Sequence, residues 1–255
     1  MSGAGPAYSA PASGGRMVNE LRAKGVKTIS IDPRFTPDAA KADIWLPIRP
    51  GTDVALQMAW IRYILVNRRY DEEFVTRWTN LPYLVEVESR FFARGENGAP
   101  DTFYVWDEKT DSMKPMEYPF DENLAPALWG TYEVDGKVYK TGMQLLYERC
   151  EEFTLEKAAE ICWLDADRIK AAIEMYLENS PSGICLGVAT DQTPNSVQAA
   201  MAADTIDFLM GNLEKPGALM QRFHTSGVLK VPNYSCCTEM SAARAVEKTS
   251  GWKRT

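Results

Sequence analysis

The sequence predicts an α/β fold: an open, mostly parallel, Rossmann-like sheet with flanking helices and a partly β insertion. In the first third of the chain, short β-branched runs alternate with segments of helical periodicity, the order that parallel α/β sheets follow. Further on, the run "SGICLGVA" at residues 182–189 is continuously apolar, as expected of a strand buried on both faces. We therefore expect residues 26–31 and 184–188 to be strands of one parallel sheet.

Local signals predict each element of the first third. The expected order is a helix at 15–23, a strand at 26–31, a helical turn at 37–43, a strand at 44–48 and a helix at 54–69. Gly25 can close the first helix in the left-handed conformation, and Pro33 stops the first strand because it has no N–H to donate. Thr52 or Asp53 can cap the start of the long helix.

The alternation stops near residue 80. Short strand-like pieces at 83–87, 102–107 and 130–140 are separated by turn-forming residues, and Asp135-Gly136 is a strong hairpin signal. We interpret about 80–145 as the β insertion. Helical periodicity then returns in four segments, at 142–153, 154–164, 165–180 and 197–211. Asp165 or Asp167 can start the third of these helices.

Charge and composition exclude several classes of partner. The net charge is −7 with no long basic run, which argues against nucleic acid. No apolar run approaches the roughly 18 residues of a membrane span, and the N-terminal residues do not form a signal peptide.

The cysteines and the single histidine predict no metal site. Five cysteines lack C-x-x-C spacing, and one histidine has no second histidine to share a metal. We expect ordinary thiols in a reducing compartment. These residues are Cys150, Cys162, Cys185, Cys236, Cys237 and His224.

Three sets of loops offer small residues beside a carboxylate or amide: residues 3–9, the pair 32–35 with 50–53, and 187–195. A carboxylate such as Asp32 or Asp53 can accept the two N–H donors of guanine, and the helix start after Asp53 can bind phosphate. Taken singly, these signals have plainer explanations. Asp32-Pro33-Arg34 can be an ordinary turn, and Gly51-Thr52-Asp53 an ordinary helix cap.

Read in order, the segments "GAGPAYSAP", "KGVKTISIDPRFTPDAAKADIWLPIRPGTDVAL", "GVATDQTPNSVQA" and "LMGNLEKPGA" resemble the large catalytic subunits of the molybdopterin oxidoreductase family, of dimethyl sulfoxide reductase type. The resemblance covers most of residues 3–222. It implies a bis(molybdopterin guanine dinucleotide) cofactor carrying molybdenum or tungsten between α/β lobes. Residues 102–110 and 191–199 look most like the branch that contains acetylene hydratase and related hydroxylating or dehydroxylating enzymes.

The resemblance assigns cofactor-binding roles residue by residue. One loop resembles the family's G-x-N-P-x-x-S pattern, with Gly5 in place of the usual Asn, so that one side-chain hydrogen bond is absent or comes from elsewhere. Two loops resemble those that hold the guanosine end, and the last resembles the one that approaches the pterin, with Asp191 and Asn195 as further contacts. The residues implied are Gly3, Ala4, Gly5, Ser9, Asp32, Arg34, Gly51, Thr52, Asp53, Gly187, Val188 and Gln192.

Family members also have parts that this sequence does not match. They begin with a domain that usually binds an iron–sulfur cluster, followed by the metal ligand. We therefore expect this chain to be an internal fragment that lacks both, is inactive alone and binds neither metal nor intact cofactor tightly. No residue is assigned as catalytic. Expected partners are an iron–sulfur electron-transfer subunit and the remainder of the catalytic subunit, in the cytoplasm or exported by the twin-arginine route.

The expected organisation is an α/β cofactor-binding lobe at 1–190, the start of a neighbouring α/β lobe at 191–224 and an irregular tail at 225–255. The alternative is a non-catalytic α/β interaction module descended from such an enzyme. An ordinary Rossmann dehydrogenase is disfavoured because no G-x-G-x-x-G follows the first strand.

Overall fold

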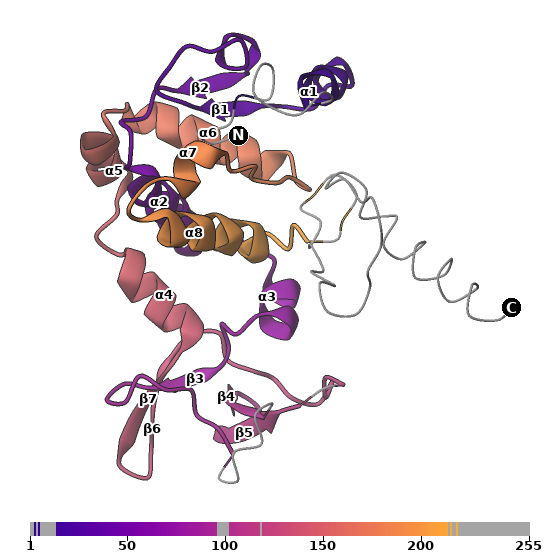
Figure 1. The fold of residues 1–255 in the computed structure, drawn as a ribbon. Helices are drawn as coiled ribbons and strands as arrows, with labels where there is room; N and C mark the ends of the chain where they lie inside the picture. Colours follow the sequence, from indigo (N-terminus) through magenta and orange to yellow (C-terminus); the bar gives the residue numbers. More distant parts are fainter. Residues whose placement is uncertain are drawn as a thin grey trace, which may run out of the picture.

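The computed structural model describes Gly3, Gly5 and residues 14–95, 102–117, 119–213, 215 and 218, and has a mixed α/β architecture (Figure 1). The helices are α1 (Gly14–Ala23), the 3-10 helix η1 (Ala39–Lys41), α2 (Asp53–Val66), α3 (Glu72–Trp78), α4 (Gly142–Cys150), α5 (Leu155–Cys162), α6 (Ala166–Glu178), α7 (Val188–Asp191) and α8 (Ser196–Leu209). The strands are β1 (Ile29–Ile31), β2 (Ile44–Leu46), β3 (Leu84–Glu86), β4 (Phe103–Asp107), β5 (Ser112–Met116), β6 (Thr131–Val134) and β7 (Lys137–Thr141). The α/β class is confirmed.

The parallel part of the described structure is the pair β1 and β2, with Ile29 opposite Ile44. β1 is shorter than the predicted strand at 26–31. The cause lies at Thr28, whose N–H donates to the carboxylate of Asp43 at 2.8 Å instead of to a neighbouring strand. A side chain thus closes the amino-terminal edge of the pair, and the carboxyl-terminal ends of both strands open toward the loops at 32–34 and 47–52.

The predicted strand at 184–188 is wrong. Among the described residues this segment has only a single bridge, at Leu186, and α7 begins two residues later. The N–H of Ile184 donates to a side-chain oxygen of Asp207 at 3.3 Å, so it is not available to a strand. The apolar run therefore reflects packing of an irregular segment, and residues 26–31 and 184–188 do not share a sheet in the described part.

Several local signals are confirmed. Gly25 has a φ of +86° and ends α1, and the N–H of Val26 donates to Leu21 across the turn at 3.1 Å. Asp165 caps α6 by accepting from the N–H of Arg168 at 3.0 Å. Thr52 occupies the cap position of α2, but its hydroxyl donates to the carbonyl of Arg49 at 2.7 Å and caps nothing.

The core surrounds α2, which is apolar on almost every side. Nine of its fourteen residues are buried, so the helix must be covered all round. α8, α5 and α4 cover it, and Figure 1 shows α8 lying across α2. α8 comes from the segment expected to begin a neighbouring lobe, yet it packs into the same core through Ala202, Ile206 and Leu209. The division at residue 190 stays a prediction.

The insertion is β-rich, as predicted. β3, β7 and β6 form an antiparallel sheet, and β4 pairs with β5. The hairpin turn between β6 and β7 has Asp135 and Gly136 at φ values of +53° and +77°, both left-handed, as a two-residue turn of the predicted kind requires. β5 and α3 were not predicted. For α3 a signal existed, because Asp71 accepts from the N–H of Phe74 at 3.0 Å as an N-cap.

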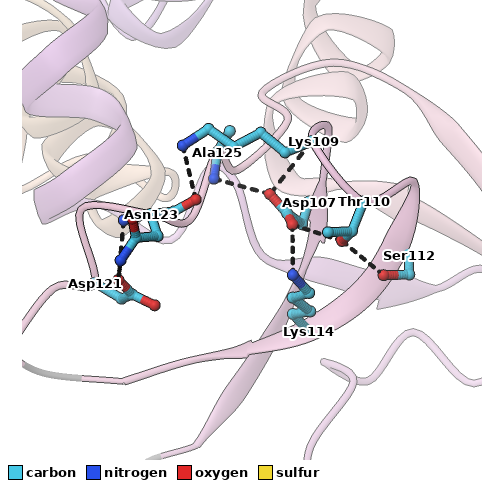
Figure 2. A network of polar contacts seen from close by, with 8 residues as sticks. All are labelled: Asp107, Lys109, Thr110, Ser112, Lys114, Asp121, Asn123 and Ala125. Carbon is cyan, nitrogen blue, oxygen red and sulfur yellow. Dashed lines mark hydrogen bonds and ion pairs between the residues drawn. The ribbon is translucent and has the colours of Figure 1, made fainter.

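Asp107 holds the β4–β5 hairpin to the loop that follows it (Figure 2). The residue is fully buried, and one carboxylate oxygen accepts from Nζ of Lys114 at 2.7 Å and from the hydroxyl of Thr110 at 2.6 Å. The other oxygen accepts from the N–H of Ala125 at 2.9 Å. Three hydrogen bonds hold the pKa of Asp107 well below its usual range. The bond from Lys114 has the largest effect on this pKa, followed by those from Thr110 and Ala125.

No helix in the described part of the chain has both the length and the apolar character needed to cross a bilayer.

We predict that Asp107→Asn lowers the midpoint of thermal unfolding at neutral pH and flattens its dependence on acid pH. A carboxyl with a depressed folded-state pKa contributes stability above its ordinary pKa of about 4, and this contribution is lost as the pH falls toward the folded-state pKa. The variant has no such contribution to lose. Calorimetry at several pH values measures it, with the exposed Asp121→Asn as control. Equal shifts in the two variants would contradict the prediction.

Candidate functional site

Gly3 joins two of the loops that the sequence singles out. Its N–H donates to the carbonyl of Ile31 at the end of β1 at 3.0 Å. A side chain at Gly3 would place Cβ 3.0 Å from Cβ of Ala189 and 3.5 Å from the backbone nitrogen of Thr190, and the φ of Gly3 is +59°. Only glycine fits this conformation and contact without strain. The first loop, the end of β1 and the start of α7 therefore meet at one place.

Asp32 lies where these segments meet and is 6% exposed. Its N–H donates to the carbonyl of Leu46 at 3.2 Å, and one carboxylate oxygen, Oδ1, accepts from the N–H of Arg34 at 2.8 Å. The ordinary turn is thus present. Within the described part, the second carboxylate oxygen, Oδ2, has no hydrogen-bond donor. The side chain of Arg34 is exposed beside it in sequence.

The second strand ends in the loop 47–52, whose contacts run to α5. The N–H of Arg49 donates to the carbonyl of Cys162 at 2.9 Å, and the thiol of Cys162 donates to the carbonyl of Thr52 at 3.5 Å. Gly51 takes a φ of +81°, and Asp53 lies half-buried in the first turn of α2. Because β1 and β2 are parallel, this loop opens at the same edge as Asp32. No described hydrogen bond joins Asp53 to Asp32.

The third loop is short and internally bonded. Gly187 is the N-cap residue of α7, and its carbonyl accepts from the N–H of Thr190 at 2.9 Å and from the Thr190 hydroxyl at 2.6 Å. The side chains of Val188 and Gln192 are exposed. Asn195 is the N-cap residue of α8, although its side chain does not cap the helix. Ala4 and Ser9 lie outside the described residues, and Gly5 is buried.

A buried polar cluster that sequence reasoning missed lies behind this loop. The Tyr176 hydroxyl donates to Oδ1 of Asp207, and Nδ2 of Asn212 donates to the Tyr176 hydroxyl at 3.1 Å and to Oγ of Ser182 at 3.0 Å. Oδ1 of Asn212 accepts from Ser180 at 3.0 Å. We call these residues, with Ile184, the Asp207 cluster. A signal was present in the sequence, because Asp207 is a carboxylate between the apolar residues Ile206 and Phe208 near the end of α8.

The described cysteines are thiols without a metal-binding arrangement. Cys150 and Cys162 are buried and Cys185 is exposed, and burial raises the pKa of Cys150 to about 11. No group of three or more His, Cys, Asp or Glu residues that could hold a metal is found within the described ranges. His224, Cys236 and Cys237 lie outside them.

Similarity to known proteins identifies the family of this chain. The sequence matches the molybdopterin oxidoreductase family over residues 1–249. The chain belongs to this family. The resemblance to this family is therefore confirmed, and the family implies a molybdopterin cofactor.

Individual relatives cover several reactions. The sulfite dehydrogenase of Allochromatium vinosum is 35% identical over 165 residues, which cover 60% of this chain and 17% of that protein. Acetylene hydratase of Syntrophotalea acetylenica is 28% identical over 210 residues, covering 81% and 20%. A solved structure of acetylene hydratase from Pelobacter acetylenicus superposes with a TM-score of 0.50 at 29% identity, covering 76% and 19%. The chain spans about a fifth of the length of these relatives.

Asp207 makes stability depend on pH. Burial, the largest cause, raises the pKa of Asp207 to about 6 from 3.8, and Asp204 on the same helix adds to the rise, while the bonds from Tyr176 and Ile184 oppose it. Stability from this group is fully present below its ordinary pKa and is lost as the pH rises through about 6. The difference of about two pKa units corresponds to roughly 3 kcal/mol.

We predict that the free energy of unfolding of the wild type, relative to Asp207→Asn, falls by roughly 3 kcal/mol between about pH 4 and pH 7. Urea titrations of both proteins at matched pH values measure the difference. Parallel pH profiles for the two proteins would contradict the assigned pKa.

Proposed function

We propose that this chain forms the cofactor-binding part of a molybdenum or tungsten enzyme with a bis(molybdopterin guanine dinucleotide) cofactor, an oxidoreductase or a member of the hydratase and hydroxyl-transfer branch. One observation carries the proposal. Gly3, Asp32 and the start of α7 meet at the carboxyl edge of the parallel pair β1–β2, where open α/β folds bind nucleotides.

The residues at this edge fit the guanine end of such a cofactor. Asp32 is buried, its turn occupies Oδ1, and Oδ2 has no donor within the described part. Guanine offers N–H donors that an ionised carboxylate accepts, each bond being worth roughly 1.5–3 kcal/mol. Gly3 lets backbone approach backbone closely, which suits a loop that lies along a ligand.

Asp53 is better suited to accept a hydrogen bond from a ligand N–H or O–H than to lie beside a phosphate. Its carboxylate already lies in the first turn of α2, where it interacts favourably with the positive end of the helix. A phosphate at the same helix start would meet this negative charge. We therefore assign Asp53 to a ribose hydroxyl or guanine N–H, and assign Arg34, exposed after the turn, to phosphate.

Gly51 and Thr52 shape the loop that carries Asp53, and Gly187, Val188 and Gln192 form the surface offered to the pterin. When bound, the cofactor supplies the metal centre and its chemistry, and these residues orient it and exclude water. The family resemblance implies a metal ligand and an iron–sulfur cluster in the complete enzyme, with an electron-transfer subunit as a further partner. A non-catalytic interaction module would not need a buried carboxylate with an open oxygen, so we do not favour that alternative.

We predict that Asp32→Asn lowers cofactor occupancy at least tenfold while shifting the midpoint of thermal unfolding little. The amide keeps the turn, since Asn is itself a turn former, but it can present an N–H where guanine needs an acceptor. A loss of about 1.5 kcal/mol corresponds to the tenfold change. The protein is produced, with any sequence that adjoins this chain in its gene, in a host that makes the cofactor. The pterin content of the purified protein is then measured.

Asp43→Asn is the matched control. Asp43 lies at the opposite, amino-terminal edge of the same strand pair, where it accepts from the N–H of Thr28 and from Lys27. The substitution removes the same charge from the same sheet, and we expect it to lower stability without lowering occupancy. Unchanged pterin content in Asp32→Asn, or an equal fall in both variants, would reject the role of Asp32 in guanine binding.

We also predict that Gly3→Val reduces pterin content without a large fall in the unfolding midpoint. Valine at a φ of +59° is strained, by roughly 1–2 kcal/mol for a left-handed conformation, and its Cβ would press on Ala189. This cost displaces the loop from α7 rather than unfolding the core around α2. Gly136→Val is the control, because Gly136 has a φ of +77° but lies at the hairpin turn of the insertion. Normal pterin content in Gly3→Val would count against the proposed site.

A further inference from the structure

The loop proposed to approach the pterin lies against the rest of the chain through the Asp207 cluster. Ile184 donates to Asp207, and Gly187, the N-cap of α7, follows three positions later in the chain. α7 in turn contacts Gly3 through Ala189 and Thr190. A continuous path of contacts thus runs from the buried end of α8 to the loops at the cofactor edge, and Figure 1 shows α7 beside α8.

The cluster is built from groups with little freedom to move. Tyr176, Asp207 and Asn212 are 7%, 2% and 0% exposed. The ring of Tyr176 packs edge-on against Trp60 of α2 with centroids 5.6 Å apart, which fixes the direction of its hydroxyl. Asn212 uses both amide hydrogens and its oxygen, on Tyr176, Ser182 and Ser180. The segment 180–184 is therefore attached at three points, although it forms no strand.

Hydrophobic packing alone would not locate this segment. Ile184 is half-buried, whereas Cys185 is exposed and Val188 is 64% exposed. Apolar contacts are non-directional, so they fix the position of a half-exposed, irregular segment less closely than hydrogen bonds do. Hydrogen bonds fix direction and distance, and a backbone N–H left unpaired by such a shift would be costly. The polar cluster is the feature that determines where the loop begins.

We propose that Asp207 and Asn212 are positioning residues for the loop Gly187–Gln192: by fixing residues 180–184 they set the place at which this loop meets the cofactor. That the loop meets a cofactor rests on the proposed function. That the cluster sets the position of the loop rests on the geometry alone. It also gives a role to Asn212, which belongs to the segment "LMGNLEKPGA" that the proposed cofactor contacts do not use.

Asp207→Asn tests the proposal directly. The amide has a single acceptor oxygen, so it cannot accept from both the Tyr176 hydroxyl and the N–H of Ile184 as the carboxylate does. We expect backbone amides in residues 184–192 to exchange with deuterium about tenfold faster in the isolated chain. In protein loaded in cells, we expect the half-time of cofactor loss to shorten at least fivefold.

Two further variants separate positioning from general loss of stability. Tyr176→Phe removes one hydroxyl and keeps the ring against Trp60, so it provides a fold-preserving variant if Asp207→Asn does not accumulate. Asp107→Asn disrupts a buried carboxylate cluster of similar size in the insertion, and we expect it to leave exchange at 184–192 and cofactor loss unchanged.

The outcomes are distinguishable. Unchanged exchange at 184–192 in both Asp207→Asn and Tyr176→Phe overturns the inference and leaves the proposed function standing. Faster exchange with normal cofactor retention also overturns it, provided that Gly3→Val loses cofactor. If Gly3→Val, Asp32→Asn and Asp207→Asn all retain cofactor normally, the proposed function itself fails, and the inference with it. Faster exchange together with faster cofactor loss, absent in Asp107→Asn, supports it.

Discussion

The packing of α8 across α2 is the contact on which the other parts of the structure depend. α2 buries nine of its fourteen residues, and this includes Oε1 of Gln57 and Nε1 of Trp60, which have no hydrogen-bond partner within the described structure. Each such atom costs about 1–3 kcal/mol, so the apolar contacts of α2 must more than offset them. Since β2 leads into α2 and the Asp207 cluster extends from α8, this one packing holds both sides of the candidate site.

Different interactions hold the two sides of the candidate site in place. On one side, β1 and β2 are joined by backbone hydrogen bonds, and Leu46 accepts from the N–H of Asp32, which brings that carboxylate to the sheet edge. On the other side, no strand is present among the described residues, and partly buried hydrogen bonds to side chains hold residues 180–184. Gly3 spans the two by bonding to Ile31 and touching Ala189. The close approach of Gly3 to α7 and the hydrogen bonds of the Asp207 cluster thus hold these segments together where further strands of the sheet would otherwise do so.

The features of the fold that could be predicted from the sequence depend on residues close together in the chain. The ends of α1 at Gly25 and of the β6–β7 hairpin at Asp135-Gly136 depend on left-handed backbone, which glycine and aspartate signal within a few residues. The segment at 184–188 was misassigned because its fate depends on Asp207, which is 23 residues away from Ile184. Composition could not reveal that bond. Asp32 was indicated by its place at a strand end and by the family resemblance, and Gly3 was assigned by that resemblance. The Asp207 cluster, distributed over α6, α8 and the segments that follow each of them, carries no short motif.

Asp32 combines a folding role with a carboxylate oxygen that has no hydrogen-bond donor among the described residues. Because Oδ1 is fixed by the N–H of Arg34 and the residue is buried, the plane of the carboxylate is set when the turn folds. A ligand that binds Oδ2 does not have to immobilise the side chain, a step that otherwise costs about 0.5–1.5 kcal/mol for a side chain with many rotamers. The conformational entropy is lost once, during folding, and the turn leaves the chain pre-organised for a donor that arrives later.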